Sequence, residues 1–263
     1  MKNVAIVCDV MKNDFLKIAA DKNINNIDFV FMEQQLHNSP DIMRKRLQEE
    51  IDKIDIEKKN SYGRILMGYG LCSNGVAGLV SKNHEIIIPK VDDCISLFLG
   101  SKERYLEEFK KDPATYYLCK GWIEFGGDPY RGYLFWTGRE NLLPKEWLRG
   151  AERYGNKKYD EDMARLLVVE LLRNYKRIVL INNNDIKKIH RKYVEDMIDF
   201  LNEVLGRQMV FEELKGSLKY IEKLINYKRK YERQNSRDSG LAHSQNFITV
   251  KPGEKILQEY FFK

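Results

Sequence analysis

The sequence predicts an α/β protein with a parallel-sheet, Rossmann-like architecture. Short runs of apolar residues alternate with longer amphipathic segments along most of the chain. Strands that are apolar on both faces are typical of parallel sheets with helices packed on each side. The chain has 263 residues and is therefore long enough to bury a substantial core.

The first half contains five predicted strands and the helices that connect them. We expect strands at residues 4–8, 27–32, 64–69, 85–88 and 114–119. We expect helices at residues 9–20, 39–54, 74–81 and 93–111, the last broken at Gly100-Ser101. Pro40 suits the first turn of the second helix, where no backbone N–H is needed.

Residues 120–156 interrupt this alternation. The segment is rich in glycine and holds all three tryptophans: Trp122, Trp136 and Trp147. We expect an irregular excursion that packs on the body and excludes water from a site through its 122–136 region. Alternation then resumes, with helices expected at 160–175, 187–205 and 217–231 and strands at 177–181, 209–214 and 247–250.

This pattern predicts three parts: an N-terminal α/β lobe at 1–119, the excursion at 120–156, and a C-terminal α/β lobe at 157–263. Residues 2–8 are similar in pattern to residues 176–182. The two lobes are therefore interpreted as a loose pseudo-repeat, although the similarity is weak.

Composition excludes several classes of protein. No apolar stretch approaches the roughly 18 residues that span a bilayer, and the N-terminus does not resemble a signal peptide, so we expect a cytoplasmic protein without a membrane partner. The net charge is +6, with much of the excess in a basic helix at 215–233. A core-facing apolar stripe makes that helix a solvated face rather than a nucleic-acid site, so nucleic acid is an unlikely partner.

Three of the four cysteines directly follow predicted strands: Cys8, Cys72 and Cys94. Because ligands of open α/β sheets bind outside the carboxyl ends of the strands, these thiols are expected to converge there. In a reducing compartment, cysteines are expected to be free thiols, ligands or nucleophiles rather than a disulfide framework. Two centres fit three thiolates: a [4Fe–4S] cluster whose unique iron is free for substrate, or zinc with an open position.

A glycine-rich segment surrounds Cys72 and offers candidate ligand-binding residues: Gly68, Gly70, Ser73, Asn74 and Gly75. Its spacing is neither the dinucleotide fingerprint nor a Walker loop. Free N–H groups at the start of the following helix would favour an anion, or a thiolate at Cys72. The alternative is a strand-to-helix turn with a packed thiol.

Cys94 follows two aspartates. Asp93 is a natural N-cap, and the helix dipole would stabilise a Cys94 thiolate, whereas the carboxylates would raise its pKa. A raised pKa weakens a nucleophile more than a metal ligand, so the pattern modestly favours ligation.

Glu33 and His37 follow the second predicted strand and are the candidate proton-transfer residues. His37 is alternatively a fourth ligand or a surface histidine. Residues 251–253, Lys-Pro-Gly, end the last predicted strand and are expected at the same edge of the sheet.

These segments together resemble an uncharacterised family known as domain of unknown function 1638. The resemblance lies in residues 6–10, 33–37, 67–75, 93–101, 121–124 and 250–253, and includes Ile-Val-Cys-Asp-Val and Met-Gly-Tyr-Gly-Leu-Cys-Ser-Asn-Gly. Such proteins are found largely in anaerobic bacteria and methanogenic archaea, often beside corrinoid methyl-transfer systems, which implies an oxygen-sensitive iron–sulfur cluster. They usually carry His-Asp-Cys where this chain has Asp92-Asp93-Cys94, so a ligand role for that histidine does not transfer.

The sequence thus predicts a metal- or cluster-binding protein with Cys8, Cys72 and Cys94 as ligands. We expect an oxygen-sensitive lyase, hydrolase or transferase that acts on a small anionic or sulfur-containing substrate. The alternative is a non-enzymatic protein that binds a small molecule or a corrinoid methyl-transfer partner, with cysteines that merely pack.

Overall fold

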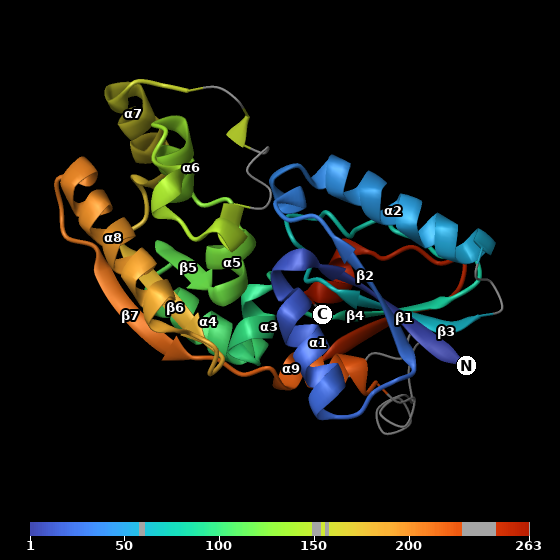
Figure 1. The fold of residues 1–263 in the computed structure, drawn as a ribbon. Coiled ribbons are helices and arrows are strands. Elements are labelled where there is room, and N and C mark those ends of the chain that lie inside the picture. The colour runs from blue at the N-terminus through green and yellow to red at the C-terminus, as the bar shows by residue number, and fades with distance from the viewer. Residues whose placement is uncertain (58–60, 149–153, 156–157, 228–245, 263) are drawn as a thin grey trace. The chain divides into compact units, whose positions relative to one another are not determined.

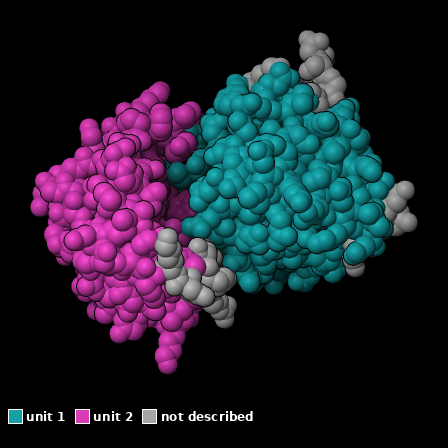
Figure 2. All heavy atoms as spheres, turned by 90° about the horizontal axis from the view of Figure 1, so that it is seen from above, with its two compact units in different colours: residues 1–102, 217–263 teal, residues 103–216 magenta. Residues whose placement is uncertain are grey.

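The computed structural model describes residues 1–57, 61–148, 154–155, 158–227 and 246–262. The chain divides into two compact units, which Figure 2 shows in different colours. Unit 1 comprises Met1–Lys102 and Ser217–Lys263, and unit 2 comprises Glu103–Gly216. Both units are mixed α/β with mainly parallel strands, so the predicted Rossmann-like fold class is confirmed.

Unit 1 is built on a five-stranded sheet with the order β2-β1-β3-β4-β8 (Figure 1). The strands are β1 (Lys2–Cys8), β2 (Ile27–Met32), β3 (Tyr62–Gly68), β4 (Glu85–Pro89) and β8 (Phe247–Val250). The first four are mutually parallel, while β8 is antiparallel to β4 and pairs Phe247 with Pro89 and Val250 with Ile86.

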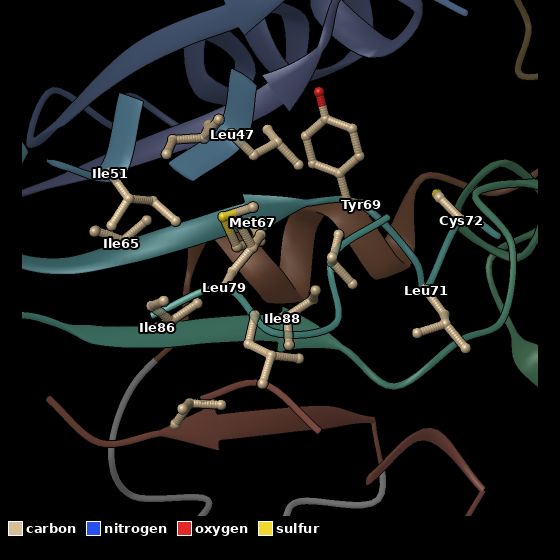
Figure 3. Close-up of a cluster of buried hydrophobic side chains, with 14 of the residues drawn as sticks. Leu47, Ile51, Ile65, Met67, Tyr69, Leu71, Cys72, Leu79, Ile86 and Ile88 are labelled. Carbon is tan, nitrogen blue, oxygen red and sulfur yellow. The ribbon is translucent and has the colours of Figure 1, made fainter. Parts of the chain in front are cut away.

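Helices pack against both faces of this sheet (Figure 1). They are α1 (Lys12–Asp21), α2 (Pro40–Glu57), α3 (Ile95–Leu99) and α9 (Lys219–Ile225), with 3₁₀ turns η1 (Asp9–Met11), η2 (Leu36–Asn38) and η7 (Gln258–Phe261). On the α2 face, Leu47 and Ile51 pack with Ile65 and Met67 of β3 in one buried cluster (Figure 3). Because successive side chains of a strand point to opposite faces, Ile65 and Met67 share this face while Leu66 points to the other.

Unit 2 contains a parallel three-stranded sheet with the order β5-β6-β7. Its strands are β5 (Thr115–Cys119), β6 (Arg177–Asn182) and β7 (Val210–Lys215). Its helices are α4 (Lys102–Lys111), α5 (Lys120–Phe125), α6 (Pro129–Trp136), α7 (Glu161–Leu172) and α8 (Lys188–Leu205), with 3₁₀ turns η3 (Glu140–Leu142) and η4 (Lys145–Leu148).

The predicted excursion is more regular than expected. Residues 120–148 form α5, α6, η3 and η4, and Tyr130, Tyr133 and Trp147 are buried in the core of unit 2. Pro129 lies in the first turn of α6, and Asp128 caps that helix by accepting from the N–H of Arg131. The segment therefore has its own helices and its own core contacts.

The division into units also differs from the predicted lobes 1–119 and 157–263. β5 pairs with β6, and β8 returns to pair with β4, so each predicted lobe contributes a strand to the sheet of the other. Because β8 is antiparallel, residues 251–253 lie at the amino edge of the parallel strands. Their predicted place at the carboxyl edge is wrong.

Two further predictions concern helices. The helix expected at 74–81 is absent: turns occupy residues 74–78, and Val80 forms an isolated β-bridge with Lys255. The basic helix expected at 215–233 is observed as α9, and its residues from 228 onward lie outside the described part of the chain. Among the described helices, none is long and apolar enough to cross a membrane.

Candidate functional site

The chain order of the unit 1 sheet reverses at β1, which lies between β2 and β3. In an open parallel sheet, a crevice for ligands forms at the carboxyl ends of the strands beside such a reversal. Cys8 is the last residue of β1, Cys72 lies in the loop after β3, and Cys94 lies in the loop after β4. Unit 1 therefore brings all three predicted cysteines to this carboxyl edge.

The two loops after β3 and β4 are joined by backbone hydrogen bonds. Leu71 N–H donates to the carbonyl of Val91 at 2.9 Å, and Cys72 N–H donates to the carbonyl of Asp92 at 3.0 Å. Gly70 permits this approach, since a Cβ there would lie 2.9 Å from the Val91 carbonyl oxygen. The pairing places Cys72 beside the loop that carries Cys94.

The loop after β3 has an unusual backbone. Cys72, Ser73 and Asn74 have φ values of 46°, 55° and 67°, all in the left-handed region that costs non-glycine residues energy. Arg44 of α2 stabilises the loop by donating to the carbonyls of Asn74 at 3.0 Å and Ala77 at 2.6 Å. A right-handed helix cannot start through these residues, so the predicted helix N-terminus at Cys72 is wrong.

The three thiols influence one another directly. The Cys94 thiol is hydrogen-bonded to that of Cys72. This contact, together with burial and the nearby Asp93, raises the pKa of Cys94 well above its usual value. Burial raises the pKa of Cys8 from 9.0 to about 12, opposed by the Val10 N–H that donates to its sulfur, while Cys72 adds to the increase. Without a bound cation, Cys8 and Cys94 are therefore neutral thiols at physiological pH.

Asp93 and Cys94 start a short helix. Cys94 is the N-cap residue of α3, and the Asp93 Oδ1 accepts from Ile95 N–H at 2.9 Å. Because α3 has only five residues, its dipole does not offset the burial of Cys94. Asp93 adds to the raised pKa of Cys94, as the sequence analysis expected of a neighbouring carboxylate, but the Cys72 contact and burial contribute more.

Tyr69 is a site residue that the sequence analysis missed. Its side chain is 3% exposed, and it lies in the same buried cluster as Cys72 (Figure 3). Cys8 packs against that cluster. Burial and nearby Cys8, Cys72, Cys94 and Glu33 raise its pKa well above 10. The sequence does carry a signal for this residue. Tyr69 follows Ile65 and Met67 at two-residue spacing, so it shares their buried face but adds a polar hydroxyl to it. We call Cys8, Cys72, Cys94 and Tyr69 the thiol site.

The two predicted proton-transfer residues lie around this site with different neighbours. Glu33 is exposed and pairs with Arg46 of α2, with Oε1 and Nε 3.3 Å apart. His37 lies at the surface on η2, where crowding by neighbouring atoms lowers its pKa from 6.5 against the opposing effect of Asp93. His37 is thus mainly neutral at pH 7, as a general base or ligand must be.

The predicted glycine cradle is largely occupied by protein atoms. A Cβ at Gly68 would meet Val7 at 2.9 Å, and one at Gly75 would meet the Met43 sulfur at 2.4 Å. These glycines, like Gly70, allow close packing. Ser73 is exposed, and Asn74 is half-buried with an Oδ1 that has no partner among the described residues.

Several polar atoms on segments that follow the strands of this sheet are buried without a hydrogen-bond partner in the described chain. They are the Tyr69 hydroxyl, the Asn74 Oδ1, the Asp92 Oδ1, the Ser96 Oγ and both side-chain polar atoms of Gln34. A buried polar group without a partner is costly, so each of these atoms is one that a ligand or a water molecule can satisfy.

The three cysteines are suitable ligands by their chemistry, because thiolates favour zinc and iron–sulfur clusters. The side-chain positions are less favourable: within the described ranges, no three His, Cys, Asp or Glu side chains are arranged as a metal-binding group. A metal would therefore require the cysteine-bearing loops to move closer together.

Comparison with known proteins gives one match. Residues 31–225 match the model of a family described as "Protein of unknown function (DUF1638)". The match covers most of the chain and includes Glu33, Tyr69, Cys72 and Cys94. No curated protein and no solved structure matches the chain.

Proposed function

Because the chain belongs to the DUF1638 family, a family of unknown function, we propose its function from the site itself. The thiol site binds a soft metal centre, either a [4Fe–4S] cluster or zinc, and the protein is an enzyme for a small anionic or sulfur-containing substrate. The observation that carries this proposal is the mutual proximity of Cys8, Cys72 and Cys94 at the reversal point of the sheet.

Electrostatics supports a cation at this position. Burial and neighbouring groups that carry or acquire negative charge disfavour the thiolates of Cys8 and Cys94. A bound cation reverses both effects, because it neutralises the sulfurs and replaces the water they have lost. When bound, the centre would supply a Lewis-acidic coordination position, which three protein ligands leave open.

The surrounding side chains have complementary tasks in this proposal. His37, which is neutral and close to Asp93, accepts a proton from the substrate. Glu33, exposed and paired with Arg46, transfers protons at the rim of the site. The Arg44 contacts support the left-handed conformation of the Cys72 loop, from which the Cys72 thiol reaches that of Cys94.

The test is metal and acid-labile sulfide analysis of protein purified without oxygen, with a visible absorption spectrum. About four iron and four sulfide per chain would support the cluster, and zinc without sulfide would support the zinc form. Cys8→Ala, Cys72→Ala and Cys94→Ala should each lose the metal. Cys119→Ala is the matched control, because Cys119 is also a buried cysteine at a strand end, in the sheet of unit 2. Full metal occupancy in the three site variants would refute the proposal.

A second candidate function is the metal-free binding of a small molecule or of a corrinoid methyl-transfer partner. The unpartnered buried atoms of Tyr69, Asn74 and Ser96 favour it, because they offer hydrogen bonds whether or not metal is present. Binding of a corrinoid or anionic ligand by the Cys8, Cys72 and Cys94 triple variant would support this candidate over the metal centre.

A further inference from the structure

The hydroxyl of Tyr69 has no hydrogen-bond partner in the described part of the chain, although its side chain is only 3% exposed. Most tyrosine hydroxyls in such positions find a partner, because burial removes the water that would otherwise satisfy them. In the same unit, the buried Tyr220 donates to the carbonyl of Asn246 at 2.9 Å. Tyr69 thus differs from a tyrosine that only packs.

The surroundings of Tyr69 fix where its hydroxyl can act. Its ring belongs to the cluster formed by Leu47, Met67 and neighbouring residues on the α2 face, so its position is held by packing (Figure 3). Cys72 belongs to the same buried cluster, and Cys8 packs against that cluster. Charge on these two thiols, on Cys94 or on Glu33 adds to the effect of burial and raises the pKa of the phenol. The hydroxyl is therefore a rigidly held polar group inside the thiol site.

The thiols themselves already have partners. The Cys8 sulfur accepts from Val10 N–H, and Cys94 is hydrogen-bonded to Cys72. A phenol is protonated at neutral pH and donates its strongest hydrogen bonds to anionic acceptors. The partner missing from the protein is thus an acceptor that arrives with a ligand.

We infer that Tyr69 is a ligand-binding residue whose hydroxyl donates a hydrogen bond to a small anion held beside the three thiols. This inference rests on the proposed function, because it assigns the anion to the open side of the same site. It adds a specificity element: the substrate class carries an anionic oxygen, nitrogen or sulfur that accepts this hydrogen bond.

The experiment uses cobalt(II) as the probe metal and thiocyanate as the probe anion. Cobalt–thiolate absorption bands report metal binding, and their change on adding thiocyanate reports anion binding. Tyr69→Phe should keep the cobalt affinity and stoichiometry of the wild type but bind thiocyanate about tenfold more weakly, the effect expected for losing one hydrogen bond to a charged group. Tyr220→Phe is the matched control and should bind thiocyanate like the wild type.

Two results would overturn the inference. One is equal thiocyanate affinity in Tyr69→Phe and the wild type. The other is weakened cobalt binding with unchanged thiocyanate affinity, which would show that the hydroxyl serves a protein sulfur instead.

Failure of the metal proposal gives a different result, because wild-type protein would then not bind cobalt at all. Thiocyanate binding to the metal-free proteins, measured by isothermal titration calorimetry, then decides the inference. Weaker binding by Tyr69→Phe than by the wild type and Tyr220→Phe would support it, whereas no binding by the wild type, or equal binding, would overturn it. Thermal unfolding checks folding, and Tyr69→Phe should be no less stable than the wild type, since the hydroxyl has no protein partner to lose.

Discussion

The carboxyl edges of the two sheets use their polar residues in contrasting ways. In unit 2, His190 accepts from Lys187 N–H at 2.8 Å through Nδ1 and contacts Glu124 at 3.1 Å through Nε2. Asp128 accepts from Tyr193 at 2.7 Å and from Arg131 N–H at 3.0 Å. In unit 1, by contrast, the buried Tyr69 hydroxyl and both side-chain polar atoms of Gln34 have no partner among the described residues. Unit 2 has such atoms as well, including the Asn183 Oδ1 directly after β6. We call Glu124, Asp128, His190 and Tyr193 the acid–imidazole network.

The difference shows how to separate a structural network from a binding site. Both edges place titratable groups after parallel strands, which is the arrangement that usually marks function. A network whose members satisfy one another stabilises the fold and leaves little to offer a ligand. A set of buried groups that lacks partners is unfavourable by itself and gains from a ligand. Because the unpartnered Tyr69 hydroxyl shares a buried cluster with Cys72, against which Cys8 packs, the comparison favours unit 1 as the functional edge.

The largest expected effect concerns pH and the thiol site. Below its pKa of about 12, Cys8 is protonated, and Cys94 is held protonated in the same way, so a metal must displace these protons. Metal affinity should rise with pH near neutrality by about tenfold per pH unit for each proton displaced, and so by about 1000-fold if three are released. Competition with a chelator of known pH dependence measures this slope. A metal affinity independent of pH would contradict thiol ligation.

The next prediction tests the acid–imidazole network. Asp128→Ala removes the acceptor of the buried Tyr193 hydroxyl and the cap of α6, and should lower the free energy of unfolding by about 3 kcal/mol. Asp160→Ala is the matched control, because Asp160 caps α7 from an exposed position and should cost only about 1 kcal/mol.

Denaturant unfolding measures both changes, and metal content is measured on the folded proteins. Asp128→Ala should leave the metal content unchanged. A loss of metal without a loss of stability would reverse the assignment of the two edges.

Gly70→Ala tests how the thiol site is assembled. The added Cβ would lie 2.9 Å from the Val91 carbonyl oxygen and 3.0 Å from the Asp93 carbonyl carbon, so the loop with Cys94 must move away from Cys72. We expect a loss of about 1–3 kcal/mol in unfolding free energy together with reduced metal occupancy. Gly63→Ala at the start of β3 is the control, since its Cβ would meet a side-chain oxygen of Asn3 at 3.3 Å. Equal effects of both substitutions would mean that the loop contact is unimportant for metal binding.

The smallest expected effect is at the rim. Glu33→Gln breaks an exposed ion pair with Arg46, which should change the unfolding free energy by less than about 1 kcal/mol. If Glu33 transfers protons, the same variant will alter the pH profile of activity once a substrate is found. An unchanged pH profile would leave His37 as the proton-transfer residue.

Much of the fold followed from local pattern. The strand Ile27–Met32 is found at its predicted bounds, and the break at Gly100 separates α3 from α4 as expected, with φ of 83° at that glycine. Apolar periodicity fixes such elements because each buries a face that the chain itself specifies. The antiparallel direction of β8 was not predictable in this way, since Phe247–Val250 has the same apolar pattern for either direction.

The candidate site, like the fold, combines features that the local sequence pattern predicted with features that it did not. The sequence alone placed Cys8, Cys72 and Cys94 after three strands, and a parallel sheet then brings those ends to one edge. The Gly-rich segment after β3 was interpreted as a ligand cradle, but contacts with Val7, Met43 and the loop after β4 explain its glycines. Those neighbours are distant in sequence, so no local pattern could reveal them.

The sequence by itself determined the α/β class, most strand positions and the gathering of the thiols, because these depend on apolar periodicity and on strand polarity. Only the tertiary structure decided that Cys72 to Asn74 adopt a left-handed loop and that the Cys94 thiol is hydrogen-bonded to that of Cys72. It also decided that the Tyr69 hydroxyl is buried without a partner among the residues that the structure describes. The physical reason is that hydrogen-bond satisfaction and desolvation depend on which distant segments meet, and those contacts form only when the whole sheet is assembled.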